Sequence, residues 1–191
     1  MSFSLNLSHV GIHVKDMPRM VDFYTGFLGF CVSDRGPTRD GGEIVFMTRD
    51  PREHHQFVLA TGRPEDLNYN IVNQLSFRVD SLATLREMRE GLKHEEATEL
   101  GAVSHGNALS VYFHDPEKNR VELLIDTPFY VPQPCRLPVD LSLPDDELWA
   151  SVEKSARELP GFKSRAAWQA DIERRIAEAT ANRRRRAAVP A

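Results

Sequence analysis

Residues 110–124 read SVYFHDPEKNRVELL, and residues 45–59 read VFMTRDPREHHQFVL. Each stretch joins two apolar, alternating segments through an Asp-Pro pair, a combination that suits a turn between two strands. The two pairs begin at Asp50 and Asp115, so they lie 65 residues apart. This offset indicates an internal repeat, and a repeat decides the architecture of a chain.

A second pair of segments gives the same offset independently. Residues 7–16 read LSHVGIHVKD and residues 72–80 read VNQLSFRVD, which places His9 opposite Gln74, again 65 residues apart. Each segment is a short alternating strand that ends in an Asp suited to cap a helix. The sequence therefore predicts an α+β fold of two βαβββ modules, at about residues 5–64 and 70–128.

Local signals predict a helix after the first strand of each module. The first helix is expected to begin near Asp16, with Pro18 in its opening turn, where a missing N–H costs little. The second helix is expected to use Asp80 as its cap. Alternation in the strands predicts one apolar face and one polar face. The polar face is expected to carry His9, His55, Gln74, Tyr112 and Glu122.

The pattern changes near residue 130. Residues 1–130 are predicted to form the repeat domain, and residues 131–191 a Pro-rich connector followed by a helical tail. The two tail helices are expected at about residues 145–158 and 164–181, where they would pack on the domain or on a partner subunit.

The charge and the hydropathy of the chain argue against several classes of partner. The formal charge of −4 and the pI near 6.0 argue against nucleic acid as the main partner. No apolar run is long enough to span a bilayer, so no membrane contact is expected. The first residues lack the basic start and apolar stretch of a secretion signal, and Cys31 and Cys135 are expected to be reduced. These features predict a cytoplasmic protein.

Three segments resemble a known family: LSHVGIHV, FYTGFLGF and HGNALSVYFHDPEKNRVELLID. They are similar to segments of the vicinal oxygen chelate superfamily, which includes glyoxalase I, methylmalonyl-CoA epimerase, extradiol dioxygenases and bleomycin-resistance proteins. The resemblance covers about residues 5–130. It implies that the two modules form a partly open barrel of mixed sheet and that the protein is a homodimer.

The resemblance also implies a metal site, because the superfamily takes its ligands from the first and last strand of each module. With the 65-residue offset, these positions are His9, Gln74, Glu122 and Phe57. Phe57 cannot bind a metal, and three ligands leave room for a bidentate substrate and O2. This pattern resembles extradiol dioxygenases of the biphenyl-2,3-diol and catechol 2,3-dioxygenase kind, which use two His and one Glu. The implied cofactor is Fe(II), with Mn(II) or another divalent metal as alternatives.

Three further residues have roles that this resemblance implies for the opening of a catechol-like ring by O2. His55 would accept a proton from the substrate or stabilise the bound oxygen. Tyr112, ten positions before Glu122, would hydrogen-bond a substrate oxygen. His105 would shape the mouth of the site and transfer a proton as the ring opens.

Two other functions fit the same superfamily. A lyase, isomerase or epimerase of the glyoxalase type would use four protein ligands, and a bulge that turned Gln56 inward would supply the fourth. A small-molecule-binding protein of the bleomycin-resistance type would not catalyse a reaction. Such proteins tend to lack the metal positions that His9 and Glu122 occupy here.

Overall fold

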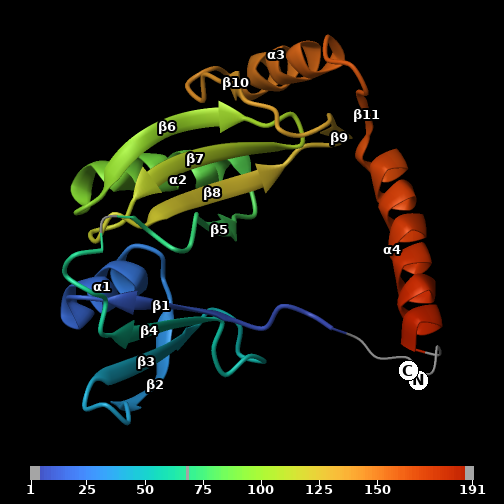
Figure 1. The fold of residues 1–191 in the computed structure, drawn as a ribbon. Helices are drawn as coiled ribbons and strands as arrows, with labels where there is room; N and C mark the ends of the chain where they lie inside the picture. Colours follow the sequence, from blue (N-terminus) through green and yellow to red (C-terminus); the bar gives the residue numbers. More distant parts are fainter. Residues whose placement is uncertain (1–4, 68, 188–191) are drawn as a thin grey trace. The chain divides into compact units, whose positions relative to one another are not determined.

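The computed structural model of the chain describes residues 5–67 and 69–187, with side chains to residue 181 (Figure 1). By their contacts the residues group into two compact units. The first contains the residues up to Phe77 together with Glu87–Leu100 and Tyr112–Glu122. The second contains Arg78–Arg86, Gly101–Val111 and the chain from Leu123 onward. The domain boundary expected near residue 130 stays a prediction.

The first module has the predicted order of one strand, one helix and three strands. Its strands form a four-stranded sheet in the order β1-β4-β3-β2, in which β1 and β4 are parallel and the other neighbours are antiparallel. The elements are β1 (Val10–Val14), α1 (Met17–Gly26), β2 (Cys31–Pro37), β3 (Glu43–Thr48) and β4 (Phe57–Thr61).

The second module repeats this order, with a short 3-10 helix after its α-helix. Its strands lie in a five-stranded sheet in the order β10-β6-β7-β8-β5, where β10 (Leu137–Pro138) comes from the tail. The elements of the module are β5 (Leu75–Arg78), α2 (Leu82–Gly91), η1 (Leu92–His94), β6 (Thr98–Ser104), β7 (Ala108–His114) and β8 (Arg120–Asp126).

The two modules confirm the predicted repeat and the α+β class. Both order their strands as first, fourth, third and second, and α1 and α2 begin 65 residues apart, at Met17 and Leu82. The strands form two separate sheets rather than one closed barrel.

The N-terminus of α1 follows the prediction, whereas that of α2 departs from it. The Asp16 side chain accepts a hydrogen bond from the Arg19 N–H at 3.1 Å, with a proline in the first turn. In α2 the capping oxygen belongs to Ser81, which accepts from the Thr84 N–H at 3.0 Å. Asp80 instead accepts from the Thr84 hydroxyl at 2.6 Å, so its expected role as the cap was wrong. Ser81 stands directly before the first helical residue, and its hydroxyl can serve as the cap.

The tail contains the two predicted helices. The strand β9 (Phe129–Tyr130), which precedes both helices, pairs antiparallel with β11 (Lys163–Ser164), which lies between them in the chain. The helices are α3 (Asp145–Arg157) and α4 (Arg165–Ala187). The Trp168 ring of α4 stacks on Tyr130, with 5.5 Å between centroids. In the described part of the chain, no helix has both the length and the apolar character needed to cross a bilayer.

Candidate metal and substrate site

The candidate site has an acidic half centred on Glu122 in β8. Glu122 is only 5% exposed, and three side chains donate hydrogen bonds to it. The Tyr112 hydroxyl donates to Oε1 at 2.6 Å. The Ser76 hydroxyl and the Gln74 amide both donate to Oε2, at 2.5 and 3.0 Å. A buried carboxylate is costly without partners, and these donors stabilise both of its oxygen atoms.

The hairpin between β7 and β8 places Glu122 opposite Tyr112. Its turn is closed by the Asp115 N–H, which donates to the Asn119 carbonyl at 3.0 Å. From this turn the two strands run antiparallel, and their side chains alternate between faces. Val121, Leu123 and Ile125 are buried as predicted, and the opposite face carries Glu122 and Arg120.

Gln74 contacts the candidate metal carboxylate directly. Its Nε2 donates both to Glu122 and, at 2.9 Å, to the Ser76 hydroxyl. The oxygen and nitrogen of an amide exchange places when the group rotates by half a turn. Gln74 therefore has the reach to offer an oxygen to an ion that Glu122 binds.

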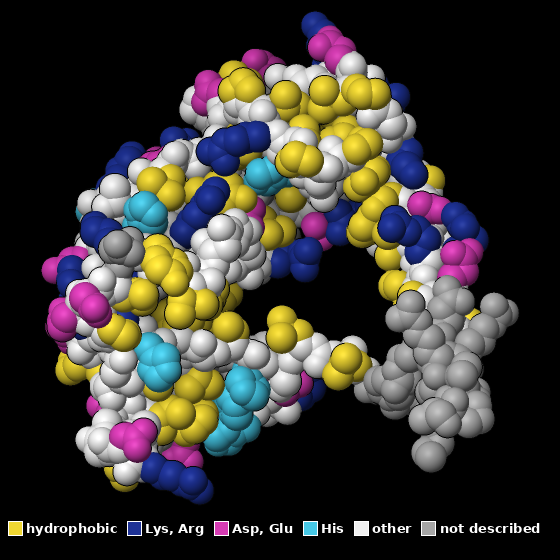
Figure 2. Space-filling model, in the orientation of Figure 1, with side chains coloured by type: hydrophobic (Ala, Val, Ile, Leu, Met, Phe, Trp, Pro, Cys, Tyr) yellow, Lys and Arg dark blue, Asp and Glu magenta, His cyan; other side chains and the backbone are white. Residues whose placement is uncertain are grey.

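The other half of the site is a group of histidines beside β4. The rings of His9 and His55 lie 4.3 Å apart, and the Nδ1 atoms of His54 and His55 share a hydrogen bond at 2.8 Å. His55 is half-buried and His54 is exposed. Burial lowers the pKa of His55, and the nearby His9 and His54 imidazoles lower it further. Figure 2 shows histidine and hydrophobic side chains together in the region where Figure 1 places the first sheet.

The position assigned to Phe57 needs a correction. Val10 pairs with Phe57 across β1 and β4, and the Phe57 side chain is fully buried, 4.5 Å from the Tyr24 ring of α1. Phe57 therefore faces the helix, and the residue on the other face of β4 is Val58, which pairs with Gly11. The 65-residue offset does not hold through the longer turn before β4, and the pairing of β4 with β1 is what fixes the face of Phe57.

The structure gives β4 no fourth metal ligand. Val58 is apolar, and the Gln56 oxygen already accepts from the Arg49 N–H at 2.9 Å. The inward turn of Gln56 that a four-ligand site requires is therefore not observed. Among the described residues, no three His, Cys, Asp or Glu side chains form a group that could hold a metal. A site built on His9 and Glu122 thus depends on Gln74 or on substrate oxygens for its remaining ligands.

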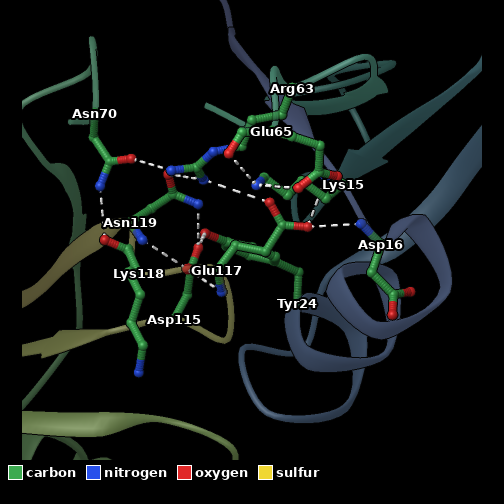
Figure 3. Close-up of polar contacts among 10 residues, drawn as sticks. All are labelled: Lys15, Asp16, Tyr24, Arg63, Glu65, Asn70, Asp115, Glu117, Lys118 and Asn119. Carbon is green, nitrogen blue, oxygen red and sulfur yellow. Dashed lines mark hydrogen bonds and ion pairs between the residues drawn. The ribbon is translucent and has the colours of Figure 1, made fainter. Parts of the chain in front are cut away.

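A buried polar network ties the Asp115 turn to the first module (Figure 3). Asp115 is fully buried and accepts from the Tyr24 hydroxyl of α1 at 3.0 Å. Glu117 accepts from the N–H groups of Lys15 and Asp16 at 2.7 and 2.8 Å, just after β1. Arg63, which follows β4, donates to Asn119 at 3.1 Å and to Glu117 at 3.4 Å. The network therefore anchors the start of β8, the strand of Glu122, to the end of β1, the strand that His9 directly precedes.

His105 belongs to the second compact unit. Its Nδ1 lies 2.6 Å from the Cys135 carbonyl, and the Gln133 amide donates to the His105 carbonyl at 2.7 Å. A carbonyl only accepts, so Nδ1 carries a proton. Its expected role in proton transfer stays a prediction.

Two residues at the acidic half were not predicted from the sequence. Ser76 lies on β5, two positions after Gln74, and Arg120 lies on β8, two positions before Glu122. Because strand side chains alternate, both could have been found by stepping two residues from a candidate ligand. The Arg120 guanidinium lies 4.5 Å from the centre of the Tyr112 ring.

Comparison with known proteins gives the family context. The sequence model of the Glyoxalase/Bleomycin resistance protein/Dioxygenase superfamily matches residues 6–123. The chain is 28% identical to biphenyl-2,3-diol 1,2-dioxygenase 3 of Rhodococcus globerulus over 131 residues, which cover 66% of each protein. It is 27% identical to biphenyl-2,3-diol 1,2-dioxygenase 2 of the same organism, covering 66% of this chain and 65% of that protein. The chain thus spans just under two thirds of the length of these relatives.

Solved structures share the fold. A glyoxylase/bleomycin resistance protein/dioxygenase domain from Frankia sp. EAN1pec has a TM-score of 0.57 and 24% identity, covering 66% of this chain and all of that one. The fosfomycin resistance protein FosX from Listeria monocytogenes, complexed with Mn(II) and sulfate, has a TM-score of 0.53 and 18% identity, covering 65% of this chain and 95% of that one. At these identities the likeness concerns the fold alone.

Proposed function

Because the chain belongs to the Glyoxalase/Bleomycin resistance protein/Dioxygenase superfamily, we propose that it is a metal-dependent extradiol dioxygenase, which opens the ring of a catechol-like substrate with O2. The observation that carries the proposal is the buried Glu122 carboxylate with its three donors. The similarity to two biphenyl-2,3-diol dioxygenases supports this activity over the other members of the superfamily.

We assign the metal to His9, Gln74 and Glu122. An imidazole nitrogen, an amide oxygen and a carboxylate suit a divalent transition metal, and Fe(II) is the ion that fits oxygen chemistry, with Mn(II) as the alternative. The bound metal supplies the positive charge that lowers the pKa of the diol hydroxyls and the redox centre that O2 chemistry needs. The polar network of the Asp115 turn supports this assignment, because it ties β8, which carries Glu122, to the end of β1, which begins directly after His9.

His55 is the residue we assign as the base. The shift of its pKa below the ordinary value of 6.5 keeps its imidazole neutral at pH 7, so the ring can accept a proton from a diol hydroxyl. Its place beside His9 puts this basic group next to a metal ligand.

Tyr112 holds the carboxylate through the proton of its hydroxyl, and the same oxygen can accept a hydrogen bond from a substrate hydroxyl. His105 is assigned to proton transfer as the ring opens. Its Nδ1 proton binds the Cys135 carbonyl, so Nε2 is the atom that would exchange the proton.

Oxygen consumption tests the proposal directly. The chain is loaded with Fe(II) without air, its metal content is measured, and a panel of substituted catechols is added in an oxygen electrode. We expect one O2 consumed per diol. Iron-loaded protein that consumes no O2 with any catechol would reject the proposal, and protein that binds a catechol but no metal would favour a non-catalytic binder. A homodimer accompanies the proposal and is checked by light scattering.

A further inference from the structure

Arg120 lies on the polar face of β8, two residues before Glu122. Residues two apart on a strand have side chains on the same face, about 7 Å apart along it. The guanidinium covers the Tyr112 ring at 4.5 Å, and the hydroxyl at the far end of that ring donates to Glu122. The Tyr112 ring therefore separates a cation from the candidate metal carboxylate.

Arg120 differs from the other half-buried arginines in having no acidic partner. Arg63 pairs with Glu117, Arg86 with Asp145, and Arg89 with Glu99. The Nε of Arg120 is buried without a hydrogen-bond partner, and no carboxylate pairs with the side chain, among the residues that the structure describes. A buried N–H without an acceptor is unfavourable, so such a group points to an acceptor that comes from outside the chain.

The charge of the guanidinium and its surroundings favour an anion as that acceptor. A guanidinium presents a planar fork of N–H groups that matches a carboxylate. The residue across the hairpin from Arg120 is His114, which adds no negative charge. The nearest acid on the same face of β8, Glu122, is already held by three donors.

We propose that Arg120 binds a carboxylate on the substrate, so that the preferred substrates are catechols with a carboxylate-bearing side chain. The proposal rests on the dioxygenase function and adds the substrate class to it. A catechol bound beside Glu122 would need only a short side chain to bring a carboxylate to the guanidinium, because the side chains of Arg120 and Glu122 lie about 7 Å apart along the strand.

Matched substrates that differ only in charge test this proposal. The probes are 3-(2,3-dihydroxyphenyl)propanoate and its methyl ester, with kcat/KM measured by oxygen consumption and binding measured by calorimetry without O2. The wild type should prefer the acid. In Arg120→Gln the ratio of kcat/KM for acid over ester should fall about 30-fold, as expected for a lost charge-assisted hydrogen bond. Arg120→Lys should give an intermediate ratio, because the charge stays and the fork is lost.

The control is Arg78→Gln, which removes an exposed arginine of β5 that pairs with Asp126. Its acid-to-ester ratio should equal that of the wild type.

A wild type that turns over both probes with equal efficiency would overturn the role of Arg120 and leave the dioxygenase function intact. An Arg120→Gln variant that loses both activities by the same factor while keeping its thermal midpoint would also overturn it, because Arg120 would then only position Tyr112. No O2 consumption with either probe or with the wider catechol panel would reject the function itself.

Discussion

The two Asp-Pro turns begin with the same two residues but differ in burial and in the direction in which the pKa of the aspartate is shifted. Asp115 is buried, accepts hydrogen bonds from Asn119 and Tyr24, and has its pKa raised by burial, although these hydrogen bonds oppose the shift. Asp50 lies nearer the surface, and the hydrogen bonds from Arg52 lower its pKa to about 2. The buried turn fixes the strand that carries Glu122, whereas the outer turn leads into the histidines before β4. The comparison shows that the same turn is buried and internally hydrogen-bonded in one module and held by an exposed arginine in the other.

The largest expected effect comes from removing the ligand that each half contributes. Glu122→Gln and His9→Ala should each lower kcat/KM by more than about 1,000-fold, beyond the 10–100-fold that is typical of residues that only support a ligand. Bound iron should fall in both variants by elemental analysis. Glu65→Gln, whose side chain is 87% exposed, is the control. A variant of either ligand with full iron and full activity would contradict the assignment.

The next largest effect is expected on metal affinity, from the removal of a hydrogen bond that holds Glu122. Tyr112→Phe removes the hydrogen bond to Glu122 Oε1 and should weaken metal binding about 10–100-fold. The measurement is competition with a metal-binding dye. Tyr69→Phe, at a residue that is 66% exposed, should bind metal like the wild type. Equal affinities of the two variants would show that Tyr112 does not hold a metal ligand.

The two turns should differ in their contribution to stability. Asp115→Asn replaces an acceptor that faces several donors and should cost about 2 kcal/mol at pH 7. Asp50→Asn should change the midpoint of urea unfolding far less, because its partners are exposed. Equal shifts in the two variants would show that burial of the turn is not what distinguishes them.

The pH dependence of the Asp115 variant follows from the direction of the pKa shift. A raised pKa means that folded protein binds this proton more tightly than unfolded protein does. The wild type therefore gains stability from this group as the pH falls from 7 toward the ordinary value of 3.8, and Asp115→Asn does not. The cost of the substitution should be larger at pH 4 than at pH 7 in urea unfolding. A cost that shrinks in acid would show that the hydrogen bonds outweigh burial.

The smallest expected effect is a gain in metal affinity. Gln74→His puts a stronger nitrogen ligand next to Glu122, and we expect metal affinity to rise about tenfold in the dye competition, a change of about 1.4 kcal/mol. Gln74→Ala should lower it. If neither substitution changes the affinity, Gln74 is not a ligand, and substrate oxygens must complete the site.

Local patterns predicted the elements well and failed where residues were counted across a loop. The offset of 65 held for the first strand and helix of each module, since Met17 and Leu82 begin the two helices. It failed at β4 because the strand starts seven residues after Asp50, whereas β8 starts five residues after Asp115. A difference of two residues would by itself keep a side chain on the same face, so the face of Phe57 is known only from its pairing with Val10 in the structure.

Some contacts had no signal in the sequence. The pairing of Tyr112 with Glu122 follows from the hairpin, but the bond from His105 to the Cys135 carbonyl joins positions 30 residues apart with no shared pattern. That the Nε atom of Arg120 is buried without a hydrogen-bond partner can also be seen only in the structure. Sequence alternation therefore assigned most residues to a face, and three-dimensional packing decided what each one touches.

In the proposed site His9 and Glu122 bind one metal ion, and anomalous diffraction from crystals of the Fe(II)-loaded protein would locate that ion. We predict a single anomalous peak bonded to the His9 imidazole and to a Glu122 oxygen in the same molecule. A peak bonded to only one of them, or located elsewhere, would contradict the account.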